Sequence, residues 1–142
     1  MDILTGTARV ITINDSVSIK STELQKYNLC KGEKILLKTR NSDKEWEFNN
    51  FYKDYIYLTE TAAKYCVKKG ISMIGIDYLS IGSFIGGSET HKILLNAGIW
   101  IIEGLKLNGI SSGSYEFICL PLKIFKCDGA PARVIIRKKL HK

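Results

Sequence analysis

The sequence predicts an α/β domain in which helices pack on a mixed sheet. A helix-like segment at 60–69 runs directly into an apolar segment at 72–76, which is typical of a crossover between strands. The strand-like segments 115–120 and 133–138 flank the turn sequence CDGAPAR, which indicates a hairpin-like return. A length of 142 residues, 45% of them hydrophobic, fits a single domain over residues 1–142.

The elements in the first part of the chain are predicted from runs of β-branched and apolar residues. ARVITI at 8–13 and KILLKT at 34–39 indicate strands, and residues 56–58 indicate a shorter one. Between the first two, Thr22 is a candidate N-cap for a short helix that starts with ELQKY. The polar and aromatic residues at 40–55 are interpreted as a loop.

The helix at 60–69 has the clearest boundaries. Thr59 is a candidate N-cap, Glu60 favours the positive end of the helix dipole, and Gly70 ends the helix. A second helix follows a glycine-rich loop, with Ser88 as its candidate cap and Gly98 after its end. GIWIIE then indicates a strand. The loop contains neither of the two phosphate-binding glycine motifs, so an active-site loop or an ordinary turn is expected at its glycines, Gly82, Gly86 and Gly87.

Charge and composition narrow the classes of partner. Lysine and arginine outnumber aspartate and glutamate by 21 to 14, a net charge of +7 that is compatible with an anionic partner. The lysines are scattered among acidic residues, however, and the one dense basic run is the tail at 137–142. We interpret it as a solvated terminus, in which His141 is an end-of-chain residue, and expect no nucleic-acid partner. Without a signal-like or membrane-spanning segment, we expect a cytoplasmic protein with no membrane contact.

The four cysteines do not point to a metal or redox motif. None of them forms a C-x-x-C pair, and disulfides are not expected in the cytoplasm. Cys66 and Cys119 lie in apolar stretches and are expected to be buried, unreactive thiols. A cysteine–histidine nucleophile pair is a weaker alternative.

His91 and Glu103 are the two residues whose chemistry needs explanation. His91 falls in the first turn of its predicted helix, where the positive helix end disfavours imidazolium and leaves the neutral ring that a metal requires. Glu103 ends a strongly apolar strand, where an unpaired carboxylate would be costly to bury. A divalent cation would account for both the neutral imidazole of His91 and the carboxylate of Glu103. The alternatives are a histidine bonded to a backbone carbonyl and a glutamate that emerges into water.

The chain resembles the cyclase family of metal-dependent hydrolases, which includes bacterial kynurenine formamidase and is arylformamidase-like. The resemblance extends from about residue 6 to residue 136. It rests on blocks in the family's order: LTETAAKYCVKKGISMIGIDYLSI, HKILLNAGIWIIEGL and GSYEFICLPLKIFKCDGAPARVII. It implies a swivelling β/β/α fold, hydrolysis of an amide-type C–N bond in a small-molecule substrate, and a divalent metal, Zn or Mn. It also implies that His91 and Glu103 are metal ligands.

One part of the family pattern is absent from this chain. The family's early motif H-x-G-T-H-x-D, which supplies the other ligands and an acid–base histidine, does not occur; LTGTARVI at 4–11 retains only its G-T pair. The resemblance therefore implies no catalytic residue in this chain. It suggests a domain that lacks its N-terminal part, about 60 residues. We expect either a partial hydrolase or an inactive remnant that acts through association, and a homo-oligomer in both cases because the family is commonly dimeric and a bare sheet edge invites pairing.

Asp77 is a further candidate, for substrate binding. It lies at the end of a predicted strand, just before the glycine-rich loop, where pockets of α/β sheets often form. The alternative is an aspartate that caps a turn.

Overall fold

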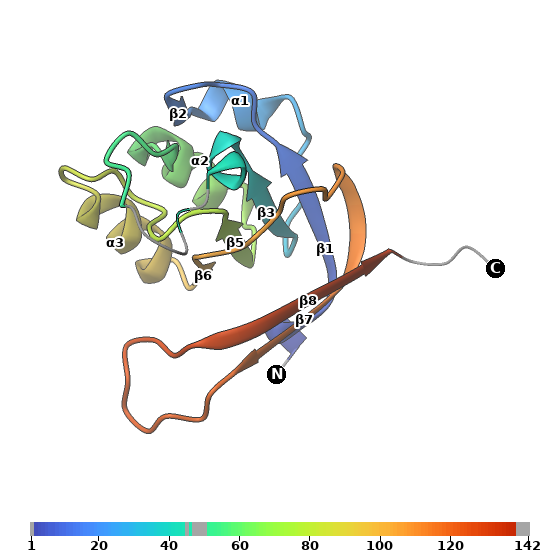
Figure 1. The fold of residues 1–142 in the computed structure, drawn as a ribbon. Helices are drawn as coiled ribbons and strands as arrows, with labels where there is room; N and C mark the ends of the chain where they lie inside the picture. The colour runs from blue at the N-terminus through green and yellow to red at the C-terminus, as the bar shows by residue number, and fades with distance from the viewer. Residues whose placement is uncertain (1, 45, 47–50, 139–142) are drawn as a thin grey trace.

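The computed structural model describes residues 2–44, 46 and 51–138, and Figure 1 shows one long hairpin that extends away from the helices. Residues 139–142 of the basic tail and part of the loop at 40–55 lie outside the described residues. The elements in chain order are the 3₁₀ helix η1 (Asp2–Leu4), β1 (Thr5–Thr12), β2 (Ser18–Ile19), α1 (Ser21–Gln25), β3 (Lys34–Lys38), the 3₁₀ helix η2 (Arg40–Asp43), β4 (Tyr57–Leu58), α2 (Glu60–Lys69), β5 (Met73–Ile76), α3 (Ser88–Asn96), β6 (Trp100–Ile102), β7 (Gly113–Pro121) and β8 (Ala132–Lys138).

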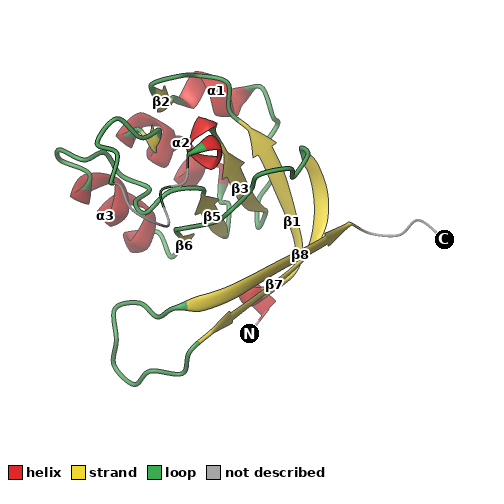
Figure 2. Cartoon of the chain, viewed as in Figure 1, coloured by secondary structure: helices red, strands yellow, loops and turns green. Residues whose placement is uncertain are grey.

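The main sheet is mixed, which confirms the predicted fold class. Its strand order is β6-β5-β3-β1-β7-β8, and the first four strands run parallel to their neighbours. β7 is antiparallel to β1, and β8 is antiparallel to β7. The last two strands form the extended hairpin in Figure 2. β2 and β4 form a separate parallel pair.

Alternating side chains of the central strands pack on two separate cores. In β3, Ile35 and Leu37 belong to the core beneath the helices, whereas Leu36 faces a second core beside the hairpin. Successive side chains of a strand point to opposite faces, and β3 is apolar at all three positions because both faces are covered there. The α-helices therefore occupy one face of the sheet, and η1, the hairpin and the chain after β6 cover part of the other.

Helix boundaries confirm one predicted cap and correct two others. Thr59 caps α2, accepting from the Ala62 N–H over 3.3 Å, and Gly70 ends that helix in the left-handed conformation. Thr22 is not a cap, because α1 begins one residue before it and has no side-chain cap. Ser88 is not a cap either, since it is already the first residue of α3. Within the described residues, no helix combines the length and apolarity needed to cross a membrane.

Candidate metal centre

The structure brings the two predicted ligands, His91 and Glu103, into contact. His91 lies on the first turns of α3, and Glu103 follows β6 directly. A short connection returns the chain from α3 into the sheet, so residues twelve positions apart meet at the carboxyl end of β6. His91 Nε2 lies 3.0 Å from Glu103 Oε1.

Main-chain groups orient both side chains. His91 Nδ1 lies 3.0 Å from the carbonyl oxygen of Gly87, and the N–H of Ile81 donates to Glu103 Oε1 over 2.7 Å. A carbonyl oxygen can only accept, so the contact with Gly87 requires a proton on Nδ1, and Nε2 faces the carboxylate. Two electron-rich atoms that face each other at this distance need a proton or a metal ion to hold them together.

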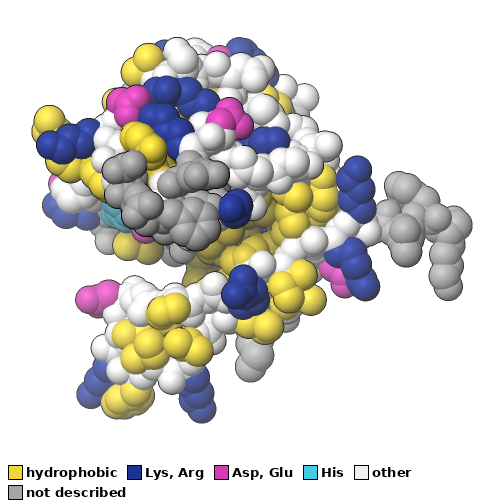
Figure 3. Space-filling model, viewed as in Figure 1, with side chains coloured by type: hydrophobic (Ala, Val, Ile, Leu, Met, Phe, Trp, Pro, Cys, Tyr) yellow, Lys and Arg dark blue, Asp and Glu magenta, His cyan; other side chains and the backbone are white. Residues whose placement is uncertain are grey.

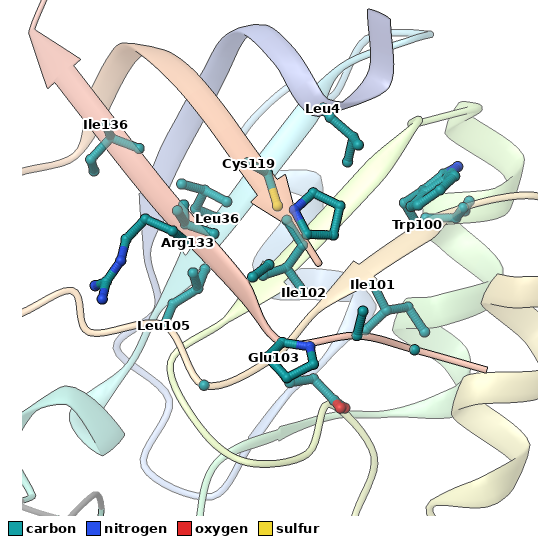
Figure 4. Close-up of a pocket in the computed structure, with 18 of the residues that line it drawn as sticks. Leu4, Leu36, Trp100, Ile101, Ile102, Glu103, Leu105, Cys119, Arg133 and Ile136 are labelled. Atoms are coloured by element: carbon teal, nitrogen blue, oxygen red, sulfur yellow. The ribbon is translucent and has the colours of Figure 1, made fainter. Parts of the chain in front are cut away.

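The pair lies at the rim of an open hollow between the sheet and the hairpin. His91 and Glu103 side chains are 31% and 33% exposed, so an ion held there would keep positions open to solvent. The hollow has a volume of about 990 Å³. Figure 4 shows the mainly apolar side chains that line it, and Figure 3 shows hydrophobic surface on the hairpin and facing it. Its walls include Leu36, Ile102, Leu105, Cys119 and Ile136.

Asp77 takes part in a different arrangement. Its side chain is fully buried, and its carboxylate accepts four hydrogen bonds, from the N–H and the hydroxyl of both Thr39 and Ser42. Burial raises the pKa of Asp77 above its ordinary value, while these hydrogen bonds oppose the shift. This geometry matches a turn-capping aspartate that joins the end of β5 to η2. A substrate contact by Asp77 stays a prediction.

The glycine-rich loop, for which the sequence predicts an active-site loop or an ordinary turn, contacts both candidate ligands through its main chain. The main chains of Gly82 and Gly87 lie so close that a Cβ at Gly82 would collide with the carbonyl oxygen of Gly87. Two of the glycines therefore permit a close backbone approach, and this approach places the carbonyl that His91 contacts. Gly82, Gly86 and Gly87 precede His91 in the sequence, but the contacts of Ile81 and Gly87 are made by main-chain atoms and could not be predicted from residue types.

Tyr55 supports the same loop from an aromatic cluster. Its hydroxyl donates to the carbonyl of Gly82 over 2.6 Å, and its ring stacks on Tyr78 with centroids 4.4 Å apart. Burial raises the pKa of Tyr55, and the negative charge of Glu103 adds to the shift. The hydroxyl therefore keeps its proton and remains a donor at neutral pH.

A complete metal site needs more donors than this pair. The described part of the chain contains no group of three or more histidine, cysteine, aspartate or glutamate residues arranged to hold a metal. Zinc takes at least three protein ligands, so His91 and Glu103 can form part of such a site.

Comparisons with known proteins agree on one family. A family model named Cyclase, described as "Putative cyclase", matches residues 2–83. Kynurenine formamidase of Bacillus thuringiensis (strain Al Hakam) is 33% identical over 138 residues, covering 96% of this chain and 65% of that protein. Cyclase-like protein 3 of Oryza sativa subsp. japonica is 32% identical over 143 residues, covering 97% of this chain and 53% of that protein.

A solved structure resembles the whole fold. The protein titled "The Structure Of Potential Metal-Dependent Hydrolase With Cyclase Activity" superposes with a TM-score of 0.89 at 33% identity, over 97% of this chain and 68% of that one. The chain thus spans between about half and two thirds of the length of the proteins it resembles.

Proposed function

Since this chain belongs to the cyclase family, we propose that it carries part of a metal-dependent hydrolase site in which His91 and Glu103 are ligands. The observation that supports this most directly is the 3.0 Å approach of His91 Nε2 to Glu103 Oε1. The reaction we propose is hydrolysis of an amide-type C–N bond in a small molecule.

The donor set fits a divalent metal such as Zn or Mn. Imidazole nitrogen and carboxylate oxygen are ordinary ligands of both ions. His91 Nε2 and Glu103 Oε1 lie 3.0 Å apart, so both atoms could contact one ion placed beside them. The Nδ1 contact to Gly87 leaves Nε2 free for the metal, and such outer contacts are usual for histidine ligands.

In this proposal, the residues of this chain bind the metal ion and orient it. Such an ion polarises a carbonyl group and lowers the pKa of bound water towards neutrality. His91 and Glu103 would fix its place at the rim of the hollow, and Glu103 would offset part of its charge. The remaining ligands and the acid–base group would come from outside the described residues.

The alternative function is a non-catalytic domain that acts through association. The ligand count supports it, because two ligands bind a metal weakly. In both cases we propose a homo-oligomer, supported by large apolar side chains exposed on the hairpin: Leu120, Leu122, Ile124, Phe125 and Ile135. A cytoplasmic location remains a prediction from the sequence.

Metal content tests the proposal. Purified protein is dialysed against a series of Zn²⁺ or Mn²⁺ concentrations, and the bound metal is measured by elemental analysis beside His91→Ala and Glu103→Ala. We expect weak binding that approaches one metal per chain at high metal concentration, and much weaker binding by both variants. Glu89→Ala, which removes an exposed carboxylate from the same helix, is the matched control and should retain the metal. Metal retained equally by all four proteins, or by none, would refute the assignment.

Formamidase activity then separates the two functions. The assay compares the metal-loaded chain with a chelator-treated sample. Turnover above that control supports the hydrolase, whereas stoichiometric metal without turnover supports the non-catalytic alternative.

A further inference from the structure

One short loop contacts both candidate ligands through its main chain. In loop 79–87, the N–H of Ile81 donates to Glu103 Oε1, and the carbonyl of Gly87 contacts His91 Nδ1. The two ligands come from different elements, a helix and a strand. Their relative position therefore depends on the shape of this loop as well as on the sheet.

Ile81 is itself held from the opposite side. Its carbonyl accepts from the N–H of Leu58 over 2.8 Å, and its side chain is fully buried. A single peptide segment thus connects β4 to the carboxylate of Glu103. Movement of Ile81 would cost a sheet-edge hydrogen bond and buried apolar area together.

Two further contacts fix the curvature of the loop. The backbones of Gly82 and Gly87 approach so closely that a side chain on either would collide with main-chain atoms of the loop. The buried hydroxyl of Tyr55 donates to the carbonyl of Gly82 over 2.6 Å. Gly82 is one of the two glycines whose backbones approach each other. The hydrogen bond of Tyr55 therefore reaches His91 and Glu103 through the main chain of the loop.

We propose that loop 79–87 is the positioning element of the metal centre, and that Tyr55, Gly82 and Gly87 are its positioning residues. The inference rests on the proposed function, because it assigns the loop a role at the same site. Contacts of this outer kind typically change metal affinity by about 10–100-fold.

The test compares Tyr55→Phe with Tyr115→Phe. Tyr115 is also buried, and its hydroxyl also donates to a carbonyl, that of Ser111 over 2.8 Å, on a different part of the sheet. Each variant loses one hydroxyl–carbonyl hydrogen bond and keeps its ring, so similar losses of stability are expected. Two properties are measured: Zn²⁺ affinity by chelator competition, and hydrogen exchange of the Ile81 amide in the metal-free protein.

We expect Tyr55→Phe to bind Zn²⁺ about tenfold more weakly and to exchange the Ile81 amide faster, with Tyr115→Phe close to the parent in both. Equal behaviour of the two variants would overturn the inference. If the parent binds no Zn²⁺, the proposed function fails, and the Ile81 exchange rates alone decide whether the loop depends on Tyr55.

Gly82→Ala is a stronger version of the same test. Its methyl group would displace the Gly87 carbonyl directly, so a folded variant should lose most of its Zn²⁺ affinity. Parent-like affinity in folded Gly82→Ala would contradict the proposal. If this variant does not fold, the tyrosine pair remains decisive.

Discussion

The hydroxyl of Thr39 donates to Asp77 Oδ1 over 2.9 Å, and the main-chain N–H of Thr39 donates to Oδ2 over 2.7 Å. This pair connects residues 38 positions apart, at the ends of the neighbouring strands β3 and β5. Ser42 adds two more donors to the same carboxylate. Asp77 therefore organises the turn that leaves β3, next to the strand end that leads to loop 79–87.

Replacing Asp77 by asparagine should destabilise the fold. The amide has one acceptor oxygen where the carboxylate has two, so the hydrogen bonds from Thr39 and Ser42 cannot all be kept in their present form. We expect a loss of about 2–4 kcal/mol in the free energy of unfolding, measured by chemical denaturation. Asp54→Asn is the control, because Asp54 is exposed and its ion pairs contribute little. A loss no larger than that of the control would contradict this role.

The contributions of Asp77 and Asp15 to stability should change with pH in opposite directions. Burial raises the pKa of Asp77 above 3.8, so its contribution is complete at low pH and declines as pH rises through the folded-state value. The hydrogen bond from Lys20, with those from the N–H groups of Val17 and Ser18, lowers the pKa of Asp15. The contribution of Asp15 to stability is therefore complete above pH 3.8 and is lost as the pH falls below that value.

Melting temperatures measured from pH 3 to pH 7 test the directions of these two pH dependences. The difference between the parent and Asp77→Asn should narrow as pH rises, whereas the difference between the parent and Asp15→Asn should widen. Parallel trends for the two variants would show that one of the two shifts has been assigned the wrong direction.

The α2 cap gives a prediction with a built-in control. Thr59→Ala removes the acceptor for the Ala62 N–H and the hydroxyl that donates to the carbonyl of Ile19 over 3.0 Å. A loss of about 1 kcal/mol in the free energy of unfolding is expected. Thr22→Ala should have a much smaller effect, because Thr22 is exposed and lies inside α1. Similar losses for the two variants would contradict the cap.

These threonines also show what local sequence can predict. The cap of α2 and its end at Gly70 were predicted because each depends on the residues beside it. The predictions for Thr22 and Ser88 were wrong because α1 begins at Ser21 and α3 begins at Ser88, and neither helix has a side-chain cap. Most strands were found within a few residues of their bounds, since both cores require apolar runs.

The site was predictable only where side chains carry the chemistry. In the sequence, His91 is one of two histidines and Glu103 is a carboxylate at the end of an apolar strand. The family resemblance implies that both are metal ligands. The supporting contacts come from the main chain of Ile81 and Gly87. Main-chain groups are the same in nearly every residue, so the sequence does not indicate which of them will make such contacts. The Asp77 contacts join segments far apart in the chain, so no local pattern reports them.

Thiol reactivity should divide the four cysteines into two pairs. Burial raises the pKa of Cys66 to about 12 and also raises that of Cys119. A buried, protonated thiol reacts slowly with maleimide. Cys30 and Cys127 are exposed, so two of the four thiols should be labelled in the native protein, and all four after unfolding. Peptide mass spectrometry identifies the labelled positions, and rapid native labelling at Cys66 would contradict the packing of α2.

Self-association should depend on the apolar tip of the hairpin. Phe125 is 85% exposed, on the turn between β7 and β8, with Leu122 and Ile124 exposed beside it. Large apolar side chains grouped on an extended arm are typical of contact surfaces, and a charge there opposes burial in an interface. Sedimentation velocity of the parent should show concentration-dependent association, which Phe125→Asp weakens at least about tenfold. Val17→Asp is the matched control, because Val17 is 62% exposed and lies in the loop before β2. A parent that stays monomeric at all concentrations, or equal weakening by both variants, would exclude the hairpin as the contact surface.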